Sequence, residues 1–250
     1  MDVIRMGPDF PYYNGQPVAI KPSGWFAILS SVVIAFLLLI TLPFPNLPLN
    51  IVPAVIYTGL PLLVLARVTS GRQTALFRRV GVKQIAQAIG FGLLTMVVSF
   101  VVGFFLMQVV PMSANPTSGV AAGIGGGIDL GGFLVRTAIQ LIGEELMTIL
   151  PLLAVLWLCV SRFGMSRGSG LVIAVLVSTA WFAAVHLPTY NWNLIQCFGG
   201  IGSARLVLTA AFLLTRNLWV SAGAHIVNDW TEFFLPDLLA LGHTPIAPGG

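Results

Sequence analysis

Apolar runs long enough to cross a lipid bilayer recur along most of this sequence. A helix needs about 20 mostly apolar residues to span the hydrocarbon core of a membrane. Hydrophobic residues make up 57% of the chain and charged residues only 8%, whereas about a quarter of the residues of a soluble domain are charged. We therefore predict an all-α fold, a polytopic transmembrane helix bundle.

We predict about seven spans, within a range of six to eight. They are expected at residues 24–44, 50–68, 85–110, 130–160, 169–187, 194–214 and 217–241. Residues 24–242 would form a single membrane-embedded domain, between a polar lead-in (1–23) and a tail (243–250). The Gly- and Pro-rich segment 111–128 is predicted to be a loop. The long fourth span is expected to tilt, to break near Pro151, or to begin with a separate half-helix.

The basic residues indicate an orientation. They lie in connections that seven spans would place on one side: Arg67, Arg72, Arg78, Arg79, Lys83, Arg162, Arg167 and Arg216. Cytoplasmic loops collect Lys and Arg, so we expect a multi-pass protein of a cell membrane, such as a bacterial plasma membrane, with a cytoplasmic N-terminus. The net charge of +4 is explained in the same way, and we expect membrane lipid and no nucleic acid as partners.

Two adjacent acids, Glu144 and Glu145, lie near the middle of the fourth predicted span. A charged group inside a span costs several kcal/mol and usually has a partner or a function. Neighbouring residues of a helix point about 100° apart, so one acid would face a cavity and the other a neighbouring helix. This division favours one functional and one structural acid, and Arg136 and Arg205 are the candidate ion-pair partners.

Two histidines also lie in or at the end of apolar spans. Taken alone, His186 fits an interfacial residue within an aromatic belt. His225, with Asn228 and Asp229 on its face of the same helix, would by itself fit polar contacts between packed helices. Together with the glutamates, however, these residues place acids and imidazoles on three spans, which is the composition of a hydrolytic site.

The same residues resemble the motifs of a known family. The pair "EE" at 144–145, "FAAVH" at 182–186 and "HIVND" at 225–229 are similar to those of the CAAX-protease and bacteriocin-processing (CPBP, or Abi) intramembrane protease family. The resemblance covers about residues 130–232. The family has an arginine where this chain has Ile149, and its role would be absent or supplied by Arg136 or Arg205.

The resemblance implies a membrane-embedded endopeptidase that acts on a membrane-anchored peptide or protein. Glu144, helped by His186, is the candidate general base, because peptide hydrolysis needs an activated water. His225, with Asn228 or Asp229, is the candidate stabiliser of the oxyanion. Glu145 would orient a histidine or bind an arginine. A Zn²⁺ ion held by Glu144, His186 and His225 is an open alternative, although the chain has no HExxH motif.

Two other functions compete with the protease. A catalytically idle member of the same fold would bind a partner, such as an envelope sensor or a protein of bacteriocin immunity, and Ile149 favours that hypothesis. A small transporter would also carry acids inside its spans. The sequence shows no inverted repeat and no matched pair of broken spans, which argues against a transporter.

Overall fold

The computed structural model describes residues 9–44 and 49–241, with residues 235–241 described by their backbone alone. The predicted tail at 243–250 lies outside these ranges. All regular structure in the described residues is helical. The helices are α1 (Pro22–Thr41), α2 (Ile51–Val68), η1 (Gln73–Leu76), α3 (Val82–Leu106), α4 (Pro116–Ala122), α5 (Gly127–Trp157), η2 (Leu158–Arg162), α6 (Arg167–Val185), η3 (Ile195–Ile201), α7 (Gly202–Thr215) and α8 (Leu218–Leu241).

Six described segments are long and apolar enough to cross a membrane. They are α1, α2, α3, α5 with η2, α6, and η3 with α7. The predicted polytopic helical bundle is confirmed, with the number of spans at the lower end of the expected range. The expected seventh span forms helix α8, which is not among the six. Its apolar sequence is interrupted by Asp229, Glu232 and Asp237.

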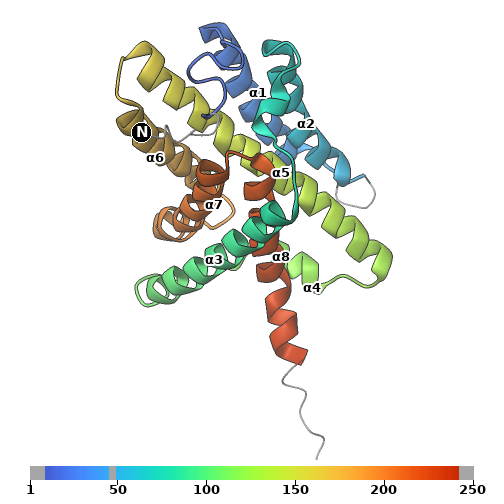
Figure 1. The fold of residues 1–250 in the computed structure, drawn as a ribbon. Coiled ribbons are helices and arrows are strands. Elements are labelled where there is room, and N and C mark those ends of the chain that lie inside the picture. The colour runs from blue at the N-terminus through green and yellow to red at the C-terminus, as the bar shows by residue number, and fades with distance from the viewer. Residues whose placement is uncertain (1–8, 45–48, 242–250) are drawn as a thin grey trace, which may run out of the picture.

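Helix α5 is the centre of the bundle. Of its most apolar window, 72% is buried inside the protein, against 11% for α3, whose surface is largely open to lipid. Figure 1 shows α5 crossing the middle of the molecule, with α1 and α2 on one side and α6 and α7 on the other. The helix runs without interruption through Pro151, so the expected break at this residue does not occur.

The predicted loop 111–128 contains a short helix, so the loop prediction was wrong for residues 116–122. Helix α4 begins at Pro116, whose fixed backbone suits the first turn of a helix. The side chain of Asn115 caps it by accepting a hydrogen bond of 3.0 Å from the Thr117 amide. This short helix lies outside the predicted fourth span, 130–160, and α5 runs through that span to Trp157 without a separate half-helix at its start.

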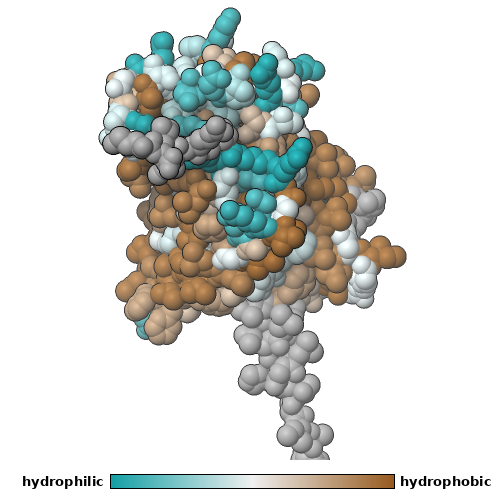
Figure 2. Space-filling view, in the orientation of Figure 1, coloured by the Kyte–Doolittle hydropathy of each residue, from teal (hydrophilic) through white to brown (hydrophobic). Residues whose placement is uncertain are grey.

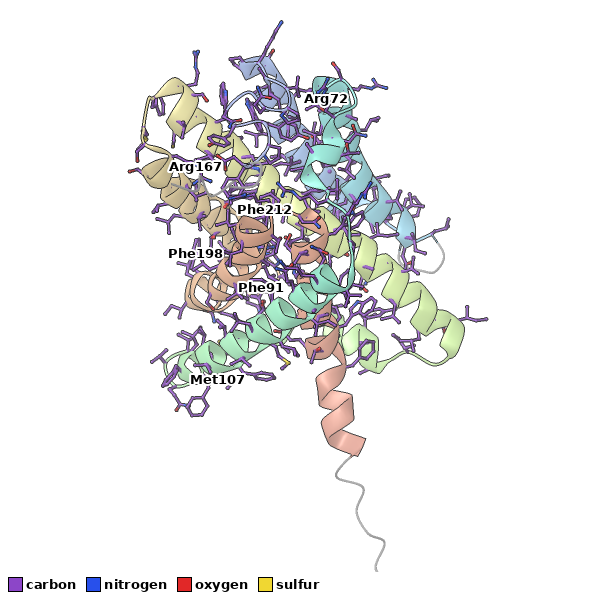
Figure 3. All side chains as sticks on the ribbon, in the orientation of Figure 1. Arg72, Phe91, Met107, Arg167, Phe198 and Phe212 are labelled. Atoms are coloured by element: carbon purple, nitrogen blue, oxygen red, sulfur yellow. The ribbon has the colours of Figure 1, made fainter. Side chains whose placement is uncertain are left out.

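The basic connections meet at one end of the bundle. Arg72 and Arg167 lie at the same end, and Met107 lies at the opposite one (Figure 3). Hydrophilic residues gather at this basic end, whereas most of the surface beyond it is hydrophobic (Figure 2). The arrangement is the one that membrane insertion requires, with charged loops outside the apolar layer.

Residues of the N-terminal lead-in pack onto the basic end. The Phe10 ring lies between two guanidinium groups, 5.1 Å from Cζ of Arg167 and 5.7 Å from Cζ of Arg216. The Tyr12 hydroxyl donates to the Arg72 carbonyl at 2.7 Å, and Ser161 Oγ donates to the Tyr13 carbonyl at the same distance. The described part of the lead-in is therefore part of the folded protein.

Helices α3 and α8 approach each other closely through a glycine. A Cβ atom added at Gly92 of α3 would lie 2.6 Å from Cβ of Val227 on α8, a distance that no real side chain tolerates. Small residues let membrane helices pack backbone to backbone. This contact fixes the height of α8 beside α3, and α8 carries three of the predicted site residues.

Candidate active site

A cavity of about 510 Å³ lies between α3, α5, α6, α7 and α8. Five of the six predicted site residues line it: Glu144, His186, His225, Asn228 and Asp229. They come from three helices that are far apart in sequence, and packing of the bundle brings them together. The sixth, Glu145, is fully buried.

Glu145 forms a two-pronged ion pair with Arg205 of α7. Arg205 Nη1 lies 2.6 Å from Glu145 Oε1, and Nη2 lies 3.1 Å from Oε2. Both side chains have no exposed surface. Parallel N–H bonds from one guanidinium fix the plane of a carboxylate as well as its position. Of the two arginines proposed as partners, Arg205 is therefore the one that contacts the glutamate pair.

His225 is surrounded by carboxylates. Its Nδ1 atom lies 3.0 Å from Glu145 Oε1, within ion-pair distance although not aligned as a hydrogen bond. Its Nε2 atom lies 3.5 Å from Asp229 Oδ1 and 3.8 Å from Glu144 Oε2. An imidazole facing acceptors with both nitrogens is placed to donate protons rather than to accept them.

Glu144 is the more accessible of the two glutamates, with 13% of its side chain exposed. One turn earlier on the same helix face, Gln140 Nε2 donates a hydrogen bond of 3.1 Å to Glu144 Oε1. The other carboxylate oxygen faces His225 across 3.8 Å, which is longer than a hydrogen bond. Glu144 thus faces the cavity and Glu145 is buried, which is the expected division between the two acids.

His186 is oriented by its own helix. Its Nδ1 atom lies 2.7 Å from the Phe182 carbonyl oxygen at the end of α6. A carbonyl only accepts hydrogen bonds, so Nδ1 carries the proton and Nε2 of the neutral ring is left as an acceptor. The Phe182 ring packs against both imidazoles, with ring centroids 4.6 Å from His186 and 6.1 Å from His225.

The Asn228 amide connects two acids of α8. Its Nδ2 atom donates to Asp229 Oδ1 at 3.0 Å and to Glu232 Oε1 at 3.2 Å. Its Oδ1 atom is buried and has no hydrogen-bond partner among the described residues. Both amide protons are thus engaged by carboxylates, which leaves His225 as the better-placed donor towards the cavity.

The side chains do not form a ready metal site. Within residues 9–44 and 49–241, no group of three or more His, Cys, Asp and Glu side chains is arranged to hold a metal ion. A catalytic zinc site needs three protein ligands at about 2 Å from the ion. The set of Glu144, His186 and His225 does not meet this requirement in the described geometry.

Further polar residues that the sequence did not single out also line the cavity, among them Gln140, Gln196 and Glu232. Helical spacing was the available signal for two of them. Gln140 lies four residues before Glu144, and Glu232 lies four residues after Asn228, each in an otherwise apolar stretch. Gln196 is far from the motifs in sequence and had no such signal.

The fold and cavity define a polytopic helical membrane protein with a carboxylate and imidazole site in its interior. Residues 127–231 match the family model described as type II CAAX prenyl endopeptidase Rce1-like, and this range contains all six predicted site residues. The predicted relationship is confirmed over this region, which makes up less than half of the chain and is similar to CAAX-protease-like membrane hydrolases. No curated protein and no solved structure matches the chain.

Proposed function

We propose that this protein is an intramembrane endopeptidase that hydrolyses a membrane-tethered peptide or protein. The observation that carries the proposal is the cavity shared by Glu144, His186 and His225. Acids and imidazoles are costly inside a membrane protein, and a protein that only bound a partner would not need all three around one cavity. Membrane lipid and the tethered substrate are the proposed partners.

In the proposed reaction, Glu144 takes a proton from a water molecule while the oxygen of that water attacks the scissile carbonyl carbon. His186 assists through Nε2, the ring atom that its hydrogen bond to Phe182 leaves as an acceptor. The carbonyl oxygen becomes an oxyanion, and His225, supported by Asn228 or Asp229, donates to it. Protonated Glu144 then passes the proton to the leaving amine as the C–N bond breaks. Preorganised donors of this kind stabilise the charge that develops in the transition state.

The test compares membranes from cells with and without the protein, first to find a peptide that changes in length. Glu144→Gln should then lower cleavage of that peptide by about 100-fold or more, because a general base typically contributes this much. Asp129→Asn is the matched control, since it alters an exposed acid at the start of the same helix. Normal cleavage by Glu144→Gln would refute the proposal and favour an idle binding protein.

The zinc alternative has a separate test. Metal content of the purified protein is compared with that of a His186→Ala/His225→Ala double variant. We expect no stoichiometric zinc in either. One zinc ion per wild-type chain, lost in the double variant, would contradict the metal-free mechanism. The attacking water would then be activated by the metal and not by Glu144.

We also propose that the basic end faces the cytoplasm of a cell membrane. The cavity is lined near the other end by Ser113 and Thr189, from connections opposite the basic loops. Substrate would then enter from outside.

Arg162→Cys and Asn191→Cys test this with a membrane-impermeant thiol reagent on intact cells, because both native cysteines are buried. Labelling at 191 but not at 162 is the expected result, and the reverse would overturn the orientation.

A further inference from the structure

Arg205 holds the second glutamate of the site from a helix outside the glutamate motif. It lies on α7 and is completely buried, although α7 contributes none of the predicted site residues. Its two terminal nitrogens contact both oxygens of Glu145, and Glu145 Oε1 is also 3.0 Å from His225 Nδ1. The three side chains form a row that crosses from α7 through α5 to α8.

We propose that Arg205 is a positioning residue of this site: it fixes the Glu145 carboxylate, and through it the His225 ring, in place of an arginine at position 149. This inference rests on the proposed function and assigns a role within it. Among the described residues, Arg205 forms its ion pair with Glu145, and this contact is the route by which we infer that it acts on the site.

The orientation of Arg205 is determined on every side. Its Nε atom donates to Thr209 Oγ1 at 3.3 Å, one turn along α7. Its guanidinium carbon lies 5.0 Å from the centre of the Phe182 ring, which also packs on His186 and His225. A guanidinium held at Nε and against an aromatic face presents its two remaining nitrogens in one plane. The carboxylate that it binds is fixed in that plane, and so is the oxygen facing His225.

Position 149 is where an arginine of the same helix would reach this carboxylate. Ile149 lies one turn after Glu145 on nearly the same face of α5, and it is fully buried. An isoleucine there has no donor. Arg136 is nine residues before Glu145 and makes no ion pair with a described residue. The contact that residue 149 cannot make is thus supplied from α7.

An ion pair that served stability alone would explain the contact with Glu145 but not its continuation to His225. Buried ion pairs contribute little net stability compared with apolar packing. Their better use is to hold one geometry among several. The prediction that separates the two roles is that moving the arginine back to α5 restores the reaction.

The experiment compares Arg205→Ala with the exchange variant Arg205→Ala/Ile149→Arg. We expect Arg205→Ala to lower kcat by about 10- to 100-fold with little change in KM, as is typical for residues that orient a reacting group. The exchange variant should recover most of the loss. Arg162→Ala, at an exposed arginine of η2, is the control and should retain wild-type kcat.

A second variant covers the case in which Arg205→Ala does not fold because an unpaired carboxylate is left buried. Arg205→Met/Glu145→Gln removes both charges together and should fold, since neutral replacement of a whole buried pair is tolerated. We expect this variant to fold with a reduced kcat. A folded double variant with wild-type kcat would overturn the positioning role.

A readout independent of turnover separates this inference from the proposed function. The ¹⁵N signals of the His225 ring, measured by NMR on the detergent-solubilised protein, should shift in Arg205→Lys, which keeps the charge and Glu145 but loses the two-pronged contact, and should remain unchanged in Arg162→Ala. Unchanged His225 signals would overturn the inference even if cleavage is established through Glu144→Gln. Shifted signals would support it even if the substrate is still being sought.

Discussion

The Nδ1 atom of His225 lies 3.0 Å from the Oε1 atom of Glu145, and this contact joins α8 to the central helix α5. On the other side of the ring, Nε2 faces Asp229 at 3.5 Å and Glu144 at 3.8 Å. The second glutamate therefore holds the side of the imidazole turned away from the cavity, while the first glutamate lies across its cavity side. The two adjacent acids act on one ring from two directions.

We predict that His225→Gln lowers cleavage by about 100- to 1,000-fold, the effect of removing one donor to a developing oxyanion. The fold should survive, because glutamine keeps a polar group near Glu145. Turnover and thermal stability of the detergent-solubilised protein are measured together. Ser221→Ala, one turn earlier on α8, is the control. Turnover that drops only in proportion to the folded fraction would contradict a role in the reaction.

Gly143 is a position at which adding one methyl group should have a large effect. A Cβ atom there would lie 2.5 Å from Cδ1 of Tyr57 and 2.7 Å from Oγ1 of Thr58, both on α2. Gly143→Ala should therefore force α5 and α2 apart and destabilise the protein by about 1–3 kcal/mol, as overpacked cores do. The shift also moves Glu144, the next residue, so cleavage should fall.

Gly131→Ala is the matched control for this prediction, because a Cβ atom at Gly131 of the same helix meets nothing within 4 Å. Alanine favours a helix over glycine by about 1 kcal/mol, so this variant should melt at the wild-type temperature or slightly above it. Equal melting temperatures for the two variants would show that α2 and α5 are not in tight contact at Gly143.

Most residues of the candidate site could be predicted from the sequence, but the helix packing that brings their partners to them could not. Acids and imidazoles stand out against apolar spans, so Glu144, His186, His225 and Asp229 were identifiable one helix at a time. The partner of Glu145 was not, because two arginines were equally eligible and their distance in sequence says nothing about helix packing. Only the folded structure, which brings Arg205 of α7 within 2.6 Å of Glu145, selects Arg205.

The helices show the same limit. Long apolar runs predict spans well. Helix α8 was predicted from such a run, but Asp229 and Glu232 interrupt it, and α8 is not among the six segments that meet the length and apolarity of a span within the described residues. Helix α4 was missed because residues 111–128 are rich in Gly and Pro, while the start signal of the helix consists only of Asn115 followed by Pro116. Local capping outweighed composition there.

Gln196 joins two connections at the rim of the cavity. Its Oε1 atom accepts from the Ser113 amide at 2.9 Å, and its Nε2 atom donates to the Ser113 carbonyl at 2.8 Å. Asn193 Nδ2 adds a hydrogen bond of 2.9 Å to the Pro111 carbonyl. The backbone of the segment before α4 is therefore held by side chains of Asn193 and of Gln196 in η3.

We predict that Gln196→Leu, which keeps the volume but removes both hydrogen bonds, loosens residues 111–115. Amide exchange at Ser113 should accelerate by about tenfold or more, because two hydrogen bonds of about 1 kcal/mol each are lost. Asn191→Gly, which removes a contact to the Ser113 hydroxyl and suits the left-handed backbone of this residue, should have a smaller effect. Equal exchange in wild type and Gln196→Leu would show that other contacts hold the segment.

The ion pair between Asp9 and Arg167 gives a prediction about pH. Arg167 Nη2 lies 2.6 Å from Asp9 Oδ1. Burial raises the pKa of the Asp9 carboxyl, but hydrogen bonds from Arg167, Tyr13 and the Phe10 amide outweigh this, and the pKa falls from 3.8 to about 2. A carboxyl with a lowered pKa stabilises the folded state above its unfolded pKa and loses that effect as pH falls through the folded value.

Asp9→Asn should therefore lower the melting temperature of the detergent-solubilised protein at pH 7, and the difference from wild type should shrink between about pH 4 and pH 2. The loss should stay below about 1 kcal/mol, because the pair is partly exposed and screened by solvent. Arg167→Gln should show the same pH dependence, and the double variant should add little to either change. A difference that is as large at pH 2 as at pH 7 would mean that Asp9 acts through something other than its charge.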